Sequence, residues 1–515
     1  MFTRTPLVWS SRIMRPRGLT IVEMIVSLAC VIILMLAYTQ LFSDVGGRIS
    51  DARSMIELET RMRSASNRLH TDLAAVTCDM MPWQKPEAGC GYFEIIEGKY
   101  RDINNLNTVF PTAKSATVLP FDPYFLGDID DILMFTVRSK EGPFTGRYVD
   151  PSGTQVTVQS EVAEVVWFLR PTMSDPSNSG TAKVFTNPPT YTLYRRVFLV
   201  MPTYQGSPTK LDASATKNLT ASSVLLPQVD PNGTGTSYFY DRNDVSVHIE
   251  LQNNTPVAVA NTLGDLTKRE CRYGHGLVNS STPHQYGYPY CIDAGYYVPF
   301  GGVYNPSPNV QPPNDYTTNP AHPHYGEDAV LTNVVAFDVK VWDPTAPLYL
   351  NGSTTVGPGD PGYTSAVVGN NPFPSANAPV SQGAFVDLNW SGHLWDPTNP
   401  NSLKWAPNVV LSPFCSTGHP ASKLNTNGAV NPVGSATYDT WSYHYEHDGV
   451  NEANPASPST NPDPATDGFQ DDVGKYETSP PYPVPLRGIK VIIRCYEPDS
   501  RQFHEVSVVE SFVPE

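Results

Sequence analysis

Histidine and carboxylate side chains are the residues of this chain whose types could bind a metal ion. Two groups mix them at close spacing: His322, His324, Glu327 and Asp328, and His444, Glu446, His447 and Asp448. The acidic run from Asp463 to Asp472, which contains Asp467 and Asp471, offers the hard oxygen ligands that calcium accepts. None of the three has the ligand spacing of a zinc motif or an EF-hand loop. We interpret them as solvated loop residues and expect no metal or other cofactor, with calcium at the acidic run as the alternative.

Catalytic side chains in a recognisable arrangement do not occur in the sequence. No serine or cysteine nucleophile stands in a motif with a base, and neither a glycine-rich phosphate loop nor a framed carboxylate pair is present. The formal net charge of −16 also implies a surface that repels phosphate backbones. We therefore predict that the protein is not an enzyme and that nucleic acid is not among its partners.

The chain has seven cysteines, and one of them, Cys30, lies in an apolar segment where we expect it to pack. The others follow that segment and are even in number, which fits disulfides in an oxidising compartment: Cys78, Cys90, Cys271, Cys291, Cys415 and Cys495. Proximity in sequence favours one disulfide between Cys78 and Cys90 and another between Cys271 and Cys291. The remaining pair is then Cys415 with Cys495. Free thiols at some of these positions are the alternative.

One further carboxylate, Glu23, stands near the start of the apolar segment from Leu19 to Phe42. A run of about 20 apolar residues is long enough to cross a bilayer as a helix. A carboxylate inside such a helix costs on the order of 3 kcal/mol and usually has a partner. A plain membrane anchor explains the span but gives no reason for this acid.

The residues that flank the apolar segment predict its orientation. Arg12, Arg15 and Arg17 precede it, so the positive-inside bias keeps that end in the cytoplasm and sends the rest outward. A cleaved secretory signal peptide is the alternative, but its apolar region is shorter and ends in small residues, whereas this run ends in Tyr38–Phe42. We predict a single-pass protein of a bacterial inner membrane with its C-terminal part in the periplasm.

The stretch Gly18-Leu19-Thr20-Ile21-Val22-Glu23 resembles the processing signal of type IV pilins and type II secretion pseudopilins. The resemblance implies cleavage between Gly18 and Leu19 by a prepilin peptidase and methylation of the new amine of Leu19, which stands where phenylalanine is commonest. It also implies that Glu23, at the fifth mature position, pairs with the amine of a neighbouring subunit during filament assembly. If Met14 rather than Met1 is the start, the leader is short and basic, as in some members of the family.

Past the membrane, a long amphipathic helix is expected to continue the span. Apolar residues recur there at mostly three- and four-residue steps: Val45, Ile49, Ala52, Ile56, Met62, Leu69, Leu73 and Val76. We predict that this one stripe faces a globular core. Gly46-Gly47 either kinks or locally melts the helix, or is simply tolerated within it. The expected organisation is a leader at 1–18, a helix at 19–76 (19–42 transmembrane, 43–76 amphipathic) and a periplasmic head at 77–515.

The head should be rich in antiparallel strands, because its apolar runs are short, β-branched and separated by turn residues. The runs are 131–137, 162–169, 191–200, 334–342, 489–495 and 506–513. Their order resembles that of the J-type minor pseudopilins and the related W-type minor pilins. The predicted fold class is α+β and pilin-like: a long N-terminal hydrophobic helix packed on a mainly antiparallel sheet, with loop insertions at about 201–330 and 343–483.

The resemblance implies a structural subunit, processed by prepilin peptidase and assembled at or near the tip of a periplasmic type II secretion filament. The alternative is a minor pilin of a type IV pilus whose insertions form a tip adhesion or ligand-binding module. The expected partners are other pilin-like subunits, reached through the N-terminal helix, together with the peptidase and the membrane.

Overall fold

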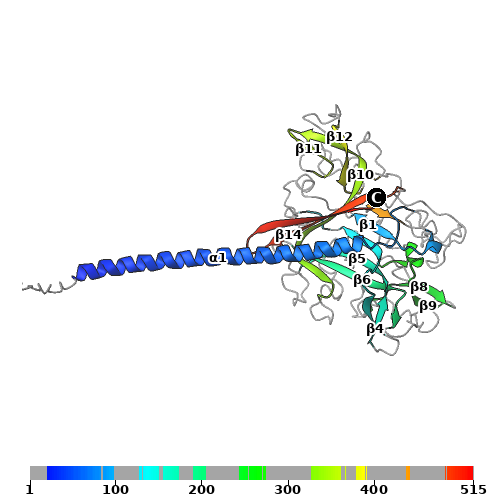
Figure 1. Cartoon of the computed structure of the whole chain (residues 1–515), viewed down its shortest axis with the longest axis horizontal. Helices are drawn as coiled ribbons and strands as arrows, with labels where there is room; N and C mark the ends of the chain where they lie inside the picture. The colour runs from blue at the N-terminus through cyan, green and yellow to red at the C-terminus, as the bar shows by residue number, and fades with distance from the viewer. Residues whose placement is uncertain are drawn as a thin grey trace, which may run out of the picture. The chain divides into compact units, whose positions relative to one another are not determined.

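The structure is a computed structural model of the 515-residue chain, in which two compact units, Met1–Leu58 and Glu59–Glu515, are distinguished (Figure 1). It describes residues 20–82, 85–97, 127–129, 131–149, 155–172, 190–204, 243–252, 255–268, 271–273, 326–360, 363, 366, 379–388, 390, 414, 436–440, 482 and 484–513.

A single helix, α1 (Ile21–Leu73), forms the N-terminal part of the described chain. Among the described residues it is the one helix long and apolar enough to cross a membrane, which confirms the predicted apolar N-terminal helix and fits a single-pass membrane protein. Gly46 and Gly47 lie within the helix, where an added Cβ at either position would meet no other atom within 4 Å. The predicted break at these glycines is therefore not observed.

The predicted single stripe along α1 is wrong, because the helix carries two apolar stripes. Leu58, Met62, Ala65, Leu69 and Leu73 are buried, whereas Val45, Ile49 and Ile56 are exposed. At 3.6 residues per turn, the step from Ile56 to Leu58 rotates the side chain by roughly 200°, to the opposite side of the helix. The six-residue gap between Ile56 and Met62 was the sequence signal of this change of face.

A ten-stranded antiparallel sheet forms the centre of the head. Its strand order is β13-β1-β2-β5-β6-β10-β14-β15, and β11 and β12 also pair with β10. The strands are β1 (Phe93–Glu97), β2 (Ile132–Arg138), β5 (Val162–Pro171), β6 (Tyr191–Val200), β10 (Ala329–Asn351), β11 (Thr354–Val356), β12 (Ser381–Val386), β13 (Ala436–Asp439), β14 (Gly488–Glu497) and β15 (Gln502–Ser511). The α+β class and the antiparallel pairing of the predicted strands are thereby confirmed.

Shorter strands form two further sheets. β3 (Phe144–Val149), β4 (Gln155–Ser160) and β7 (Thr203–Tyr204) make a three-stranded sheet, and β8 (Val247–Gln252) pairs with β9 (Thr255–Ala260). Two 3₁₀ turns, η1 (Pro86–Ala88) and η3 (Asp265–Thr267), complete the described elements. Strands β8, β9 and β11 to β13 lie within the sequence ranges predicted as insertions, so these ranges contain regular structure.

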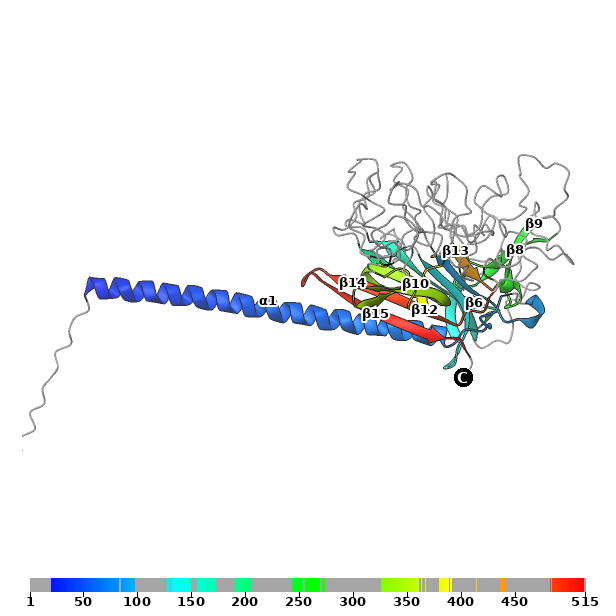
Figure 2. The ribbon, with the colours of Figure 1, turned by 90° about the horizontal axis from the view of Figure 1, so that it is seen from above.

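The last turns of α1 pack against the middle of the large sheet (Figure 2). Asp72 is buried and accepts two hydrogen bonds from Arg195 of β6, Nε to Oδ2 at 2.6 Å and Nη2 to Oδ1 at 2.7 Å. Trp167 of β5 donates its indole N–H to the same carboxylate at 3.1 Å. Near the sheet edge, His70 lies 3.0 Å from Glu510 of β15.

A hydrophobic core on strands β5 and β6 also takes side chains from the range predicted as the first insertion. Phe168 stacks on Tyr194 with ring centroids 5.7 Å apart, and Val245, Leu263 and Tyr273 are buried in the same cluster. The buried Glu164 accepts hydrogen bonds from Tyr92 Oη and Ser246 Oγ, each at 2.6 Å. These contacts join residues far apart in the sequence into one core.

Arg272 connects the two predicted insertions to β1. Its guanidinium Nη1 lies 2.9 Å from Glu94 of β1 and 2.8 Å from Asp439 of β13, and its Cζ lies 4.0 Å from the ring centroid of Tyr92. Burial alone would lower the pKa of Arg272, but Asp439 and then Glu94 raise it above its ordinary value. Because a buried ion pair with a missing partner destabilises a fold by roughly 3–5 kcal/mol, this group is a strong constraint on how the insertions fold.

Candidate functional site

The cleavage positions Gly18 and Leu19 lie outside the described residues, and the described chain begins at Thr20. Thr20 and Glu23 form a capping box at the start of α1. Glu23 Oε2 accepts hydrogen bonds from Thr20 N at 2.9 Å and Thr20 Oγ1 at 3.0 Å, and Glu23 N donates to Thr20 Oγ1 at 3.2 Å. Glu23 thus has a local role that the Thr-x-x-Glu pattern could have indicated.

The exposed side of α1 carries a regular apolar seam. Its members follow one another at alternating steps of four and three residues: Val31, Met35, Tyr38, Phe42, Val45, Ile49, Ala52 and Ile56. Ile49 is 64% exposed and Ile56 is 65% exposed, although both lie beyond the predicted membrane segment. Alternating steps of this kind are the pattern by which helices pack side by side.

The groups considered as candidate metal ligands lie mostly outside the described residues. This applies to His322, His324, His444, Glu446, His447, Asp448 and the run 463–472. The described members, Glu327 and Asp328, contact arginines: Glu327 Oε2 lies 2.5 Å from Arg147 Nη1, and Asp328 Oδ2 lies 2.6 Å from Arg196 Nη1. Each of these two acids therefore has an arginine as a partner in this structure.

The cysteines give no test of the predicted disulfides, and Cys291 and Cys415 lie outside the described residues. Cys30 is exposed on α1. Cys78 and Cys90 lie on neighbouring segments, because Thr77 Oγ1 donates a hydrogen bond to the Cys90 carbonyl at 2.6 Å. Burial and then Cys90 raise the pKa of the Cys78 thiol, and burial raises the pKa of Cys495 to about 12. Pairing of Cys78 with Cys90 stays a prediction.

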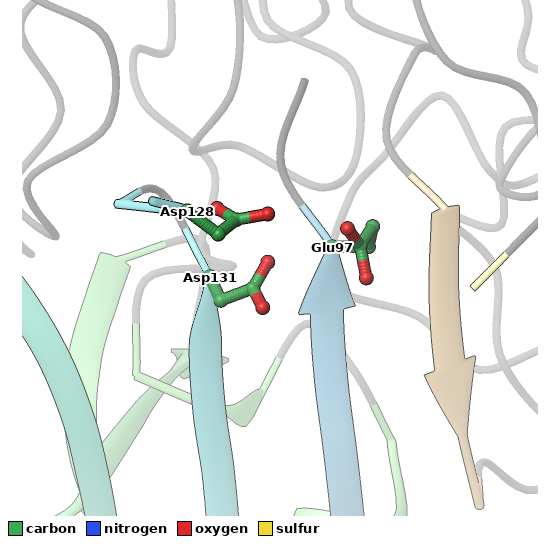
Figure 3. A group of neighbouring side chains, drawn as sticks. All are labelled: Glu97, Asp128 and Asp131. Atoms are coloured by element: carbon green, nitrogen blue, oxygen red, sulfur yellow. The ribbon is translucent and has the colours of Figure 1, made fainter. Parts of the chain in front are cut away.

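A group that the sequence analysis did not identify lies where β1 ends and β2 begins. Glu97, Asp128 and Asp131 are buried, and each offers a carboxylate oxygen such that the three oxygens lie within 4.8 Å of one another (Figure 3). Ile96 of β1 pairs with Ile132 of β2; Glu97 follows the first residue and Asp131 precedes the second, so the two acids come next to this pair. Only the acid-rich turn 127–131 could have indicated this group, because Glu97 is distant in sequence.

Backbone N–H groups donate to two of the three carboxylates. Leu388 N donates to Glu97 Oε2 at 3.2 Å, and Val339 N donates to Asp131 Oδ2 at 2.7 Å. Beside Asp128, a Cβ added to Gly127 would lie 2.4 Å from the Ala336 Cβ, so the close approach of this turn to β10 needs glycine. The turn is therefore fixed to the sheet at several points.

Three carboxylates at this separation repel one another, and a divalent cation or a shared proton would offset that repulsion. Carboxylate oxygens are the ligands that calcium and magnesium accept. Titration of the folded protein with either cation, with Asp131→Asn as the matched variant, would measure whether the group binds one.

No family model, curated protein or solved structure matches this chain.

Proposed function

We propose that the protein is a minor pseudopilin-like structural subunit, cleaved between Gly18 and Leu19 and assembled through α1 at or near the tip of a type II secretion filament. The observation that carries this proposal is the apolar seam of α1 together with Glu23 near its start. The resemblance of Gly18–Glu23 to the prepilin processing signal supplies the processing step.

The seam supports assembly because it continues past the membrane. From Phe42 to Ile56 the helix rises roughly 21 Å at 1.5 Å per residue, which carries exposed apolar side chains well beyond the hydrocarbon core. Water contact of Val45, Ile49 and Ile56 is unfavourable by about 25 cal/mol per Å² of apolar surface. A helix with a matching seam, supplied by another pilin-like subunit, would remove this cost.

Glu23 can take part in both the capping box and a contact between subunits. Its Oε2 accepts both hydrogen bonds from Thr20, while Oε1 accepts none from the described residues. The free oxygen offers a positively charged amine of a neighbouring subunit an acceptor, and such a partner offsets the cost of a carboxylate in the membrane.

The second candidate is a minor pilin whose insertions form a tip adhesion or ligand-binding module. A separate small cluster of Tyr349, Val356, Tyr363 and Ala366 favours it, because this part of the second predicted insertion has a core of its own. A segment with its own small core suits the presentation of a binding surface.

The test compares Glu23→Ala with Glu59→Ala, an exposed acid further along the same helix. We expect both variants to be cleaved and inserted, and only Glu23→Ala to lose co-purification with other pilin-like subunits. Equal co-purification of the two variants would contradict the assembly role. Replacing Gly18 by a bulky residue should leave an uncleaved precursor, and a normally shortened protein in that variant would exclude peptidase processing.

The identity of the co-purifying subunits separates the two candidates. Subunits of a type II secretion apparatus support the first, and subunits of an extended pilus support the second.

A further inference from the structure

A buried lysine lies between two buried aspartates where β10 meets the end of β12. Lys340 Nζ is 2.5 Å from Asp387 Oδ1 and 3.0 Å from Asp338 Oδ2. The side chains of Lys340, Asp387 and Asp338 are 8%, 4% and 2% exposed. No step of the proposed assembly uses this group.

Strand register aligns the three side chains. Val341 pairs with Val386, so the next position brings Lys340 opposite Asp387, and Asp338 lies two residues before Lys340 on the same face of β10. Because Nζ is 2.5 Å from Oδ1 and a carbon–oxygen bond is about 1.2 Å, Nζ lies within about 3.7 Å of the Asp387 Cγ. This upper bound is slightly above the roughly 3–3.5 Å at which reacting atoms are in near-attack geometry.

Aromatic side chains stand beside the lysine and its two carboxylates. Trp342 and Phe385 are the next cross-strand pair on the same face, with ring centroids 5.1 Å apart. Gly359, with φ of +88°, lies beside the amine, and an added Cβ there would be in ordinary contact with Lys340 Nζ, at 3.7 Å. With its side chain 8% exposed, the lysine is largely shielded from solvent.

Burial disfavours charge on both reacting groups, whereas the carboxylates beside Nζ favour the ammonium form. Transfer of a proton across the 2.5 Å contact from Nζ to Asp387 Oδ1 gives the neutral amine and the neutral carboxyl group that the reaction needs. Lys490 of β14 stands opposite Lys340 on the other neighbouring strand, and its like charge further disfavours the ammonium form. A neutral amine is the nucleophilic form of lysine.

We propose that Lys340 and Asp387 condense to an intramolecular isopeptide bond, with Asp338 as the acid–base group. Nζ attacks Cγ, an N–C bond forms, and the C–O bond to the Asp387 hydroxyl breaks. Asp338 accepts the proton that Nζ loses and returns it to the departing hydroxyl, which leaves as water. No atom changes oxidation state, so the reaction requires no oxidant, and Asp338 ends unchanged.

The bond would close a covalent loop around the start of the second predicted insertion. A cross-link of this kind limits the unfolded chain in the way that a disulfide does, and it persists under reducing conditions.

Mass spectrometry of the full-length protein, purified in detergent and then unfolded, tests the proposal directly. We expect the intact mass to be lower by one water molecule than the processed sequence requires. Chymotrypsin should release two short peptides joined through Lys340 and Asp387, and trypsin should fail to cut after Lys340. Full mass together with tryptic cleavage after Lys340 would overturn the proposal and identify the group as an ordinary buried ion pair.

Variants assign the roles of the three residues. Lys340→Arg keeps the charge but should abolish the joined peptide, and Asp338→Ala should leave both reacting groups unlinked. Asp387→Asn should give the same joined peptide as the wild type, because the amide would lose ammonia instead of water. The control is Lys490→Arg, which should retain the link. A joined peptide that survives Lys340→Arg would contradict the assignment.

Discussion

Two halves of α1 are alike in residue type but differ in what covers them. The stripe from Met62 to Leu73 is buried against the sheet of the head, whereas the seam from Val31 to Ile56 is exposed in the single chain. The buried stripe therefore contributes to the stability of one molecule. The exposed seam contributes nothing to that stability until another helix or the membrane covers it, so under the proposed function it is the surface of association.

The largest expected effect concerns Asp72, which ends the buried half. Asp72→Ala leaves the guanidinium of Arg195 buried without its carboxylate, and we expect the free energy of unfolding of the head to fall by about 3–5 kcal/mol. Chemical denaturation followed by tryptophan fluorescence measures the change. The exposed Glu59→Ala is the control, and an equally small change in both variants would mean that Asp72 does not anchor the helix.

Leu69→Ala tests the apolar part of the buried stripe. Leu69 is 0% exposed, and truncation of such a side chain costs about 2–5 kcal/mol of stability. We expect the denaturation midpoint of the head to fall accordingly. A midpoint unchanged from the wild type would show that the last turns of α1 separate readily from the sheet.

Thr20→Ala tests the first turn of the exposed half. Loss of the capping hydrogen bonds to Glu23 should cost about 1 kcal/mol of local helix stability. Hydrogen exchange in detergent micelles should therefore quicken for amides of the first turn, and Thr20→Ser should restore protection. Unaltered exchange in Thr20→Ala would mean that the capping box does not form.

The smallest effect on the folded chain is expected for Ile49→Ala, the counterpart of Leu69→Ala on the seam. Its side chain is exposed, so the free energy of unfolding should change by less than about 0.5 kcal/mol. Co-purification with other pilin-like subunits should nevertheless decrease. A loss of stability as large as that of Leu69→Ala would remove the distinction between the two halves.

Local patterns in the sequence predicted the elements but not their long-range partners. The β-branched runs marked β2, β5, β6, β10, β14 and β15, because strand preference is a property of short segments. Glu97 comes close to Asp131, and Lys340 to Asp387, because of the register between strands. These strands are far apart in the chain, so no local pattern shows the contact. The first predicted insertion is rich in proline and asparagine, and this composition did not indicate that its Arg272 would be fully buried between two acids.

The position of Asp72 also decides how the head would carry a mechanical load. Its bonds reach β5 and β6, which stand fourth and fifth in the eight-strand order β13-β1-β2-β5-β6-β10-β14-β15. A force applied along the last turns of α1 would act on the middle of the sheet. The hydrogen bonds between strands on both sides would then share the load. If α1 were attached to the edge strand β15 instead, the same force would break the hydrogen bonds between one pair of strands at a time. Attachment at the centre is therefore expected to make the sheet more resistant to unfolding under force.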